Sequence, residues 1–178
     1  MSSRLIPSSN FDSPANQNAL ISALAALPNG IHNLHLSPMF LLVAPSAFTL
    51  PPSSPPASIT PAWRTATWHV IVSAAWDPYY ATPEQINNAF AAVHQAMQPL
   101  RELTPGSGAY QNEADSFEPD PVGAYWGAGN HEKLLDVKGL VDPRNVMQVH
   151  QGVGWDPDAD GRLWDCYPSE SNWERDGL

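Results

Sequence analysis

Two stretches of the chain repeat apolar residues at spacings of three and four, which is the pattern of an amphipathic helix. In the first stretch, Ser13-Pro14 is typical of an N-cap followed by proline at the first helical position, and Pro28-Asn-Gly30 is typical of a helix stop. The apolar positions between them are Leu20, Ile21, Leu24 and Leu27. We therefore predict a short helix between these two signals.

The second stretch has the stronger helix signal. Thr82-Pro83-Glu84 supplies a capping threonine and a proline for the first turn. The apolar residues that follow keep a strict 4-3-4-3 spacing, with alanines beside them: Ile86, Phe90, Val93, Met97 and Leu100, flanked by Ala89, Ala92 and Ala96. We expect this apolar face to pack against a sheet.

Two further stretches predict the strands of that sheet. Residues 31–43 alternate or run apolar, and Pro38 among them indicates an edge strand or a bulge. Residues 64–76 give the clearest strand, because polar and apolar residues alternate along them. Thr65, Thr67, His69, Ile71 and Ser73 are expected on one face, and Ala66, Trp68, Val70 and Val72 on the other. The proline-rich residues 44–61 between the strands predict a surface loop or linker.

The last third of the chain has weaker signals. Pro105-Gly-Ser-Gly108 breaks the chain, and Asn130 is expected to cap a third helix that ends near Gly139 and Asp142-Pro143. The inner side of this helix is expected to present Leu134, Leu135 and Val137, and Val146–Val149 predicts a short final strand. The order of elements predicts an α+β fold, with a small antiparallel sheet and packed helices.

Charge and composition exclude some classes of function. The 178 residues have a formal net charge of -10, which disfavours binding to nucleic acid. The most apolar run, Phe40 to Val43, is too short to cross a bilayer, so we expect no membrane partner. Cys166 is the only cysteine, and no set of histidines, cysteines or acidic residues predicts a metal site. The cellular compartment stays open.

A polar block at Gly108-Ala-Tyr-Gln-Asn-Glu-Ala-Asp115 contains candidate chemistry. If the block is extended, Tyr110, Asn112 and Ala114 lie on one face, and Gln111, Glu113 and Asp115 on the other. One interpretation is a polar loop after a glycine-rich turn. The other is the wall of a pocket, where a desolvated glutamate has a raised pKa and moves protons.

Four more blocks follow this one along the chain: Tyr125-Trp-Gly, Asn130-His-Glu-Lys-Leu-Leu, Asp142-Pro-Arg-Asn-Val and His150-Gln-Gly-Val-Gly154. In this order the five blocks resemble the C-terminal end of berberine bridge enzyme-like FAD-linked oxidases of the fungal type. The resemblance extends from about Trp63 to Gly154 and implies FAD as cofactor. It also implies that the FAD-binding domain of such an enzyme lies outside these residues.

The resemblance implies roles for particular residues. Asn112, Trp126, Gly127 and Asn130 would lie near the flavin. Glu113 replaces a tyrosine that is a catalytic base in some plant members, so Glu113 and Tyr110 are the catalytic candidates. His69, His150 and Gln151 are candidate substrate-binding residues, although a lone histidine is often structural.

The predicted organisation has three parts. Residues 1–115 form part of a substrate-binding domain, residues 116–154 a berberine-like segment, and residues 155–178 an acidic tail. The leading hypothesis is part of an FAD-dependent oxidoreductase for a small organic or specialised-metabolite substrate. A non-redox protein that binds or guides a cyclisation, and an inactive fragment that needs a partner chain, are the alternatives. The expected partners besides substrate are a separate FAD-domain chain or a second copy of this chain.

Overall fold

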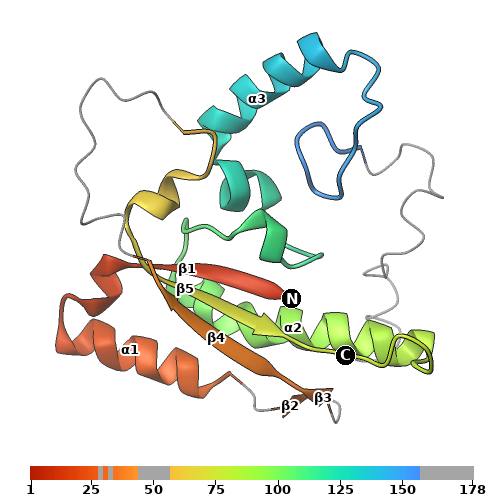
Figure 1. The fold of residues 1–178 in the computed structure, drawn as a ribbon. Coiled ribbons are helices and arrows are strands. Elements are labelled where there is room, and N and C mark those ends of the chain that lie inside the picture. The colour runs from red at the N-terminus through yellow and green to blue at the C-terminus, as the bar shows by residue number, and fades with distance from the viewer. Residues whose placement is uncertain (28–29, 32–33, 44–56, 157–178) are drawn as a thin grey trace.

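The computed structural model describes residues 1–27, 30–31, 34–43 and 57–156. A three-stranded antiparallel sheet lies at its centre, in the order β1 (Ser2–Pro7), β5 (Ala66–Ser73), β4 (Ser37–Leu42). A separate pair of short strands is formed by β2 (Gly30–Ile31) and β3 (Leu34–His35). Helices α1 (Pro14–Ala25) and α2 (Pro83–Leu103) lie beside the sheet, and α3 (Ala128–Val141) lies away from it (Figure 1). The predicted α+β class is confirmed.

Helix α1 begins where the sequence predicts. The hydroxyl of Ser13 accepts a hydrogen bond from the backbone N–H of Asn16 at 3.2 Å, and Pro14 occupies the first helical position. Such a cap satisfies one of the unpaired N–H groups at a helix start. Leu20 points into the core and is buried.

Helix α2 also confirms its prediction. Thr82 and Gln85 form a reciprocal capping box: Gln85 N–H donates to the Thr82 hydroxyl at 3.2 Å, and Thr82 N–H donates to the Gln85 side chain at 2.8 Å. Of the predicted stripe, Val93, Met97 and Leu100 are buried in the main core, whereas the stripe residues nearer the helix start are half-buried. The helix packs against α1 and β1, so its apolar face covers one side of the sheet.

Strand β5 is the central strand, and both of its faces are covered. Val70 and Val72 belong to the core beneath α1 and α2, whereas His69 and Ile71 are buried on the opposite face. The predicted strand 31–43 is interrupted at Leu36, and residues 32–33 lie outside the described residues. Among the described strands, β4 pairs with β5 alone, and it contains Pro38, which agrees with the predicted edge position.

Strand β1 was missed by pattern reasoning because its polar residues are buried. Ser2, Ser3 and Arg4 are all buried, and each makes side-chain hydrogen bonds to distant residues. Arg4 donates through Nε to the Thr104 hydroxyl at 2.9 Å and through Nη2 to the Thr104 carbonyl. Partners more than 90 residues away therefore allow a polar sequence to lie in a buried strand.

The C-terminal predictions need correction. Gly127, at φ 76°, caps α3, and Asn130 lies inside its first turn rather than at the cap. Gly139 lies within the helix, which continues to Val141. No strand forms at 146–149; instead the chain turns around Asp142. The Asp142 carboxylate accepts from the backbone N–H groups of residues 146 and 147, each at 2.9 Å, and from Lys138 Nζ at 2.6 Å.

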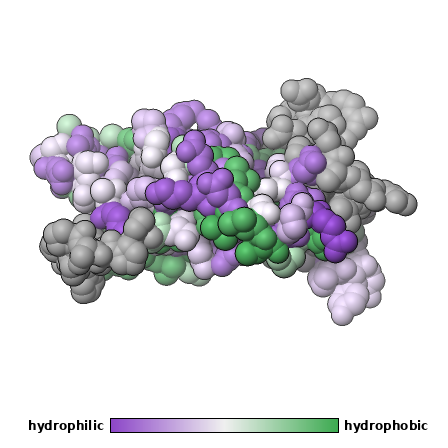
Figure 2. Space-filling model, turned by 90° about the horizontal axis from the view of Figure 1, so that it is seen from above, coloured by the Kyte–Doolittle hydropathy of each residue, from purple (hydrophilic) through white to green (hydrophobic). Residues whose placement is uncertain are grey.

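Helix α3 and the segment after it present apolar side chains to the outside. We call these residues the α3 surface; their exposed fractions are Leu135 41%, Val137 53%, Leu140 83%, Val141 67%, Val146 71% and Met147 64%. Figure 2 views the molecule from the side on which α3 lies and shows apolar atoms gathered among polar ones. The predicted inner residue Leu134 is half-buried.

A second, small apolar cluster lies across the predicted domain boundary at residue 115. It consists of Ala109, Ala124 and Tyr125, with Ala114 and Trp126 packed against it. The three-part division itself stays a prediction, and most of the predicted acidic tail and Cys166 lie outside the described residues. The helices that the structure describes include none long and apolar enough to cross a membrane.

Candidate functional site

The polar block lies against the edge of β1. The Leu5 N–H donates to the Gly108 carbonyl at 2.8 Å, and the Tyr110 N–H donates to the Ser3 hydroxyl at 3.1 Å. A side chain at Gly108 would not fit, because its Cβ would lie 2.8 Å from the Ala124 carbonyl oxygen and 2.8 Å from a Thr60 methyl. Close packing on both sides therefore fixes where the next residues lie.

The residues after Tyr110 form a single 3₁₀ turn, η4 (Gln111–Glu113). The predicted extended alternation, with Tyr110, Asn112 and Ala114 on one face, is therefore wrong. Hydrogen bonds from Glu113 N–H to the Tyr110 carbonyl at 3.0 Å and from Ala114 N–H to the Gln111 carbonyl at 3.3 Å close the turn. As a result, the side chains of η4 point in different directions around the turn.

The face of β5 opposite the helices presents His69 to this turn. Its ring is clamped by two aromatic rings, with centroid distances of 5.4 Å to Trp63 and 5.9 Å to Tyr110. Only 2% of His69 is exposed, so this side chain does not reach bulk solvent. Burial lowers the pKa of His69, and the nearby charge of Glu113 opposes that shift.

Glu113 lies at the open side of the same group. Its carboxylate oxygen is 3.7 Å from Nε2 of His69, and 32% of its side chain is exposed. Nε2 of His69 is buried and has no hydrogen-bond partner. The two groups are thus close enough to interact through charge and slightly too far apart for a hydrogen bond.

Tyr110 and Asn112 complete the exposed part of the turn. Asn112 donates from its side-chain amide to the Tyr110 hydroxyl oxygen at 2.8 Å. Because the hydroxyl accepts there, its own hydrogen is available to a ligand oxygen. Tyr110 is 37% exposed, and Asn112 is exposed. The structure therefore brings the two catalytic candidates, Tyr110 and Glu113, together with Asn112 and His69.

A cavity of about 370 Å³ opens on the other side of the turn. It is lined by Gln111, Asn112, Ala114, Asp115, Ser116, Tyr125, Val149, His150 and Gln151. Asn112 thus borders both the cavity and the Tyr110 hydroxyl. Two of the predicted substrate-binding residues, His150 and Gln151, line the cavity, whereas the third, His69, lies with Glu113 and Trp63 and is not part of the lining.

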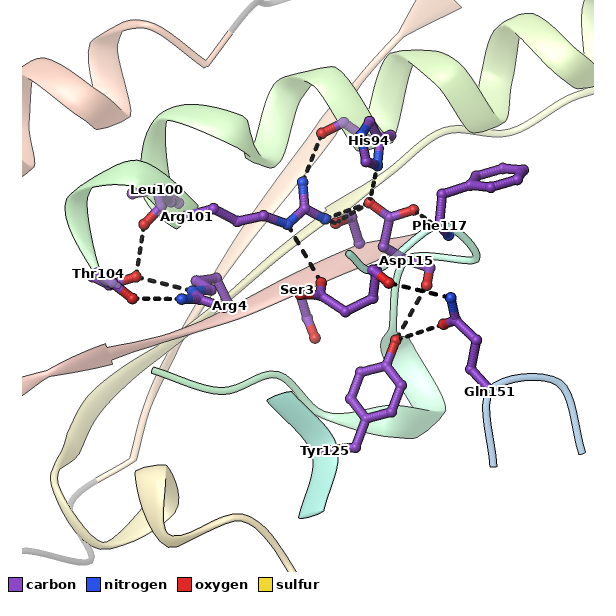
Figure 3. Close-up of polar contacts among 12 residues, drawn as sticks. Ser3, Arg4, His94, Leu100, Arg101, Thr104, Asp115, Phe117, Tyr125 and Gln151 are labelled. Carbon is purple, nitrogen blue, oxygen red and sulfur yellow. Dashed lines mark hydrogen bonds and ion pairs between the residues drawn. The ribbon is translucent and has the colours of Figure 1, made fainter. Parts of the chain in front are cut away.

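A buried ionic network connects α2 to the segment that follows the turn (Figure 3). Asp115, which is 1% exposed, accepts hydrogen bonds from His94 Nδ1 at 2.8 Å, from Arg101 Nη2 and from the Ser2 hydroxyl at 3.3 Å. Its other oxygen accepts from the Phe117 N–H at 2.9 Å. Burial opposes ionisation of Asp115, but the hydrogen bond and charge of His94 and the charge of Arg101 outweigh it and lower the pKa.

Arg101 links this carboxylate to a second one. Its Nε donates to Glu118 at 3.3 Å and its Nη1 to the His94 carbonyl at 3.0 Å. Burial raises the pKa of Glu118, against the opposing charges of Arg101 and Arg4. All three nitrogens of the Arg101 guanidinium are engaged, so the guanidinium is a structural link between α2 and the segment after η4.

Gln151 is tied into the same network. The Tyr125 hydroxyl lies 2.9 Å from the Gln151 side-chain oxygen and 3.2 Å from the Asp115 carbonyl oxygen. The Gln151 amide donates to the Glu118 carbonyl at 3.4 Å. Burial raises the pKa of Tyr125, so its hydroxyl keeps its proton and can donate. His150 is half-buried, its ring centroid lies 4.8 Å from that of Trp155, and burial lowers its pKa.

The other predicted cofactor-binding residues lie at the junction of η5 (Val122–Trp126) and α3, outside the lining of the cavity. Asn130 donates to the carbonyls of Ile59 at 2.9 Å, residue 57 at 3.0 Å and Trp126 at 3.1 Å, so its amide fastens α3 to the preceding segment. A Cβ at Gly127 would lie 2.8 Å from a Pro61 ring carbon. The indole Nε1 of Trp126 is buried without a hydrogen-bond partner.

These residues fit the ring part of a flavin rather than its phosphates. An isoalloxazine ring is planar with polar edges, and Tyr110, Asn112 and the unpartnered Trp126 indole offer hydrogen bonds to such edges. A pyrophosphate needs cations or free backbone N–H groups. The two buried guanidinium groups, Arg4 and Arg101, are already paired within the protein. Within the described residues, no cluster of histidines or acidic residues is arranged to hold a metal ion.

Sequence reasoning missed His94, Arg101 and Glu118. One signal was available: His94 and Arg101 are seven residues apart on a predicted helix, so they share one face, at the edge of the apolar stripe. A histidine and an arginine on one face suit a carboxylate partner. Nothing local in the sequence indicated that Asp115 was that partner.

The chain is similar to known proteins over most of its length. Residues 109–154 match the model of the family described as "Berberine and berberine like". The VAO-type flavoprotein oxidase VAO615 of Thermothelomyces thermophilus is 33% identical over 90% of this chain and 27% of its own length. The FAD-linked oxidoreductase ZEB1 of Gibberella zeae is 37% identical over 60% of this chain and 19% of its own length.

A solved structure gives the same result for the fold. The VAO-type flavoprotein MtVAO713 from Myceliophthora thermophila C1 superimposes with a TM-score of 0.68 at 26% identity, over 86% of this chain and 26% of that chain. The chain thus spans roughly a fifth to a quarter of the length of the relatives it matches. In sequence and fold it matches part of the berberine bridge enzyme-like group of VAO-type, FAD-linked oxidoreductases.

Proposed function

We propose that this chain supplies the substrate-facing part of an FAD-dependent oxidoreductase that oxidises a small organic or specialised-metabolite substrate. The observation that supports this most strongly is the open group on η4. A part-exposed carboxylate, Glu113, lies beside a tyrosine hydroxyl and an amide, on a turn fixed by buried ionic contacts. Relatives that match most of the chain are flavoproteins.

In this proposal, Glu113 is the general base. Its carboxylate takes the proton from a substrate hydroxyl or acidic C–H, and the Tyr110 hydroxyl donates to a substrate oxygen. When FAD is bound, its ring accepts the hydride that leaves the same substrate. Asn112 and Trp126 would contact the ring. The cavity beside Asn112, with His150 and Gln151, would hold the rest of the substrate.

The partner that fits the α3 surface is the FAD-binding portion of such a flavoprotein. Contiguous exposed apolar residues of this kind are rare on a lone chain. The chain matches 27% of the length of VAO615, so most of that flavoprotein lies outside the matched part. We take that portion, on the same or a separate chain, as the occupant, and self-association as the competing outcome.

A chimera tests the activity. The part of VAO615 that this chain matches is replaced by this chain, and the product is purified and reduced anaerobically with a panel of alcohols and phenols. The proposal predicts a yellow protein whose flavin is bleached by at least one substrate. Glu113→Gln is expected to slow flavin reduction by about 10²- to 10⁴-fold, because it removes the base. Glu132→Gln, which removes an exposed glutamate on α3, is the matched control.

The outcomes separate the alternatives. A yellow chimera in which Glu113→Gln reduces flavin at the unmodified rate would contradict the assignment of the base. A well-folded chimera without flavin, or with flavin that no substrate reduces, would favour a non-redox binding protein. Aggregation of the chain alone, relieved by co-expression of the remaining part of VAO615, would support the partner proposal.

The partner surface has its own test. Leu140→Asp should prevent this chain from binding the remaining part of VAO615 expressed as a separate chain, because it places a charge on the α3 surface. Ile21→Asp, at an exposed apolar residue of α1, is the control and should leave binding unchanged. Equal binding by both variants in size-exclusion chromatography would show that the interface lies outside the α3 surface.

A further inference from the structure

The geometry points to His69 as a positioning residue for Glu113. We propose that the N–H at Nε2 of His69 donates a hydrogen bond to the Glu113 carboxylate and aims its other oxygen at the substrate. This inference rests on the proposed function of Glu113 and goes beyond it, because it gives the buried histidine a role that needs no contact with substrate or flavin.

The first step concerns access. His69 is 2% exposed and lies on the central strand of the sheet, behind the rings of Trp63 and Tyr110. A substrate that reaches the open face of η4 therefore meets Glu113 and Tyr110 before it meets the imidazole. The expectation from the sequence that His69 binds substrate is replaced by a role exerted through its neighbour.

The second step concerns the unsatisfied nitrogen. Nε2 of His69 is buried without a hydrogen-bond partner, which costs free energy unless a partner arrives. The Glu113 carboxylate is 3.7 Å away, and an ionised carboxylate only accepts hydrogen bonds. Nε2 must then be the protonated nitrogen of a neutral ring. A movement of the Glu113 side chain by less than 1 Å would bring the pair within hydrogen-bond distance.

The third step concerns rigidity. The imidazole is held at edge-to-face angles of 66° by Trp63 and 82° by Tyr110, so its ring cannot rotate freely. Glu113, at the end of a three-residue turn and part-exposed, has the freedom to move. The fixed donor therefore selects one orientation of the mobile carboxylate. When Glu113 takes a substrate proton on its outward oxygen, His69 keeps its own proton, and no charge is created in the buried interior.

Among the described residues, the charged group that faces His69 is the Glu113 carboxylate, and Tyr110 is an ionisable ring beside it. Burial lowers the pKa of His69 and the Glu113 charge raises it, so removal of that charge lowers the pKa further. Glu113→Gln is therefore expected to move the His69 titration to lower pH. This direction follows from the pairing itself and does not require flavin.

The test is nuclear magnetic resonance of the histidine side chains in the 178-residue chain. We expect the nitrogen shifts of His69 to show the Nε2–H tautomer, and its titration midpoint to fall in Glu113→Gln but not in the control Glu132→Gln. The Nδ1–H tautomer, or the same midpoint in all three proteins, would overturn the proposal.

Two substitutions of His69 test the same proposal in the VAO615 chimera. The amide nitrogen of His69→Gln approximates the position of Nε2, so this variant should keep flavin reduction within a few-fold of the unmodified chimera. His69→Leu should lose about tenfold or more, the effect of one hydrogen bond to a charged group, with flavin content unchanged. Equal rates in the two variants would contradict positioning. A chimera that reduces no flavin would contradict the proposed function alone, and the spectra would still decide the pairing.

Discussion

Two histidine–carboxylate pairs, whose carboxylates lie two residues apart along the chain, differ in distance, burial and partners. His94 and Asp115 are 2.8 Å apart, with a carboxylate that is 1% exposed and also paired with Arg101. His69 and Glu113 are 3.7 Å apart, with a carboxylate that is 32% exposed and, among the described residues, pairs with no arginine or lysine. The Asp115 carboxylate accepts hydrogen bonds from His94 and Arg101, whereas Nε2 of His69 has no hydrogen-bond partner.

The difference indicates which of the two carboxylates can accept a proton from a substrate. Asp115 accepts from His94, Arg101, Ser2 and a backbone N–H, so a substrate proton would have to displace a contact that holds the fold. Glu113 has an open side and one unfinished contact, so it can take a proton at small structural cost. The inward pair, His94–Asp115, holds the segment that follows η4, and the outward pair, His69–Glu113, contains the carboxylate that is available to react.

The largest expected effect comes from breaking the inward pair. Asp115→Asn should lower the free energy of unfolding by about 3 kcal/mol, because it leaves the buried Arg101 short of negative charge. Chemical denaturation of this variant beside Asp136→Asn, an exposed aspartate on α3, measures the effect. If both variants unfold at the same denaturant concentration, the inward pair does not hold the fold.

Acid should weaken the same pair. The pKa of Asp115 is lowered in the folded state, so its contribution to stability is fully present above the unfolded value of about 3.9 and is lost as pH falls through the folded value. Glu118 acts in the opposite sense, because burial raises its pKa and protonation favours the fold. The stability difference between the unmodified chain and Asp115→Asn should therefore shrink below about pH 4. A constant difference from pH 7 to pH 2 would contradict the assignment.

A smaller effect is expected from Tyr125→Phe. The hydroxyl bridges the Gln151 side chain and the Asp115 carbonyl, and its loss should cost about 1 kcal/mol. Thermal unfolding measures the change, with Tyr80→Phe at an exposed tyrosine as the control. The cavity side of the turn should also loosen, seen as faster amide exchange at residues 150–152. Unchanged amide exchange at these residues would show that the Tyr125 hydroxyl does not hold Gln151 in place.

The smallest effect on stability is expected from Glu113→Gln. Its carboxylate is part-exposed and makes no hydrogen bond in the structure, so unfolding should change by less than about 0.5 kcal/mol. This small value sharpens the comparison, since a substitution two residues away is expected to cost several times more. A loss of 2 kcal/mol or more would make Glu113 structural.

Local signals in the sequence were sufficient to predict the helices whose caps and apolar stripe are formed by nearby residues. Ser13 and Thr82 cap the helices that they were predicted to cap, and the apolar stripe of α2 packs where its spacing indicates. Strand β1 was not predictable in this way, because Ser2, Ser3 and Arg4 are polar and are buried only through partners about 100 residues away.

The site followed the same division. Glu113, Tyr110 and Asn112 are candidates from the motif, and their roles stay predictions; their expected extended arrangement was wrong, because a polar sequence fits an extended segment and a 3₁₀ turn equally well. The turn is fixed by Gly108 and Ser3 contacts that no local pattern contains. Asn130 has the sequence of a helix cap, yet it binds the carbonyls of a distant segment, and Gly127 takes the cap.

The comparison of the two pairs is tested most directly by measuring flavin reduction and unfolding together in the VAO615 chimera. Glu113→Gln should slow the reduction of flavin at least a hundredfold and leave the unfolding midpoint unchanged, whereas Asp115→Asn should lower the midpoint. The account would be contradicted if Glu113→Gln reduced flavin at the unmodified rate, or if Asp115→Asn left the midpoint unchanged.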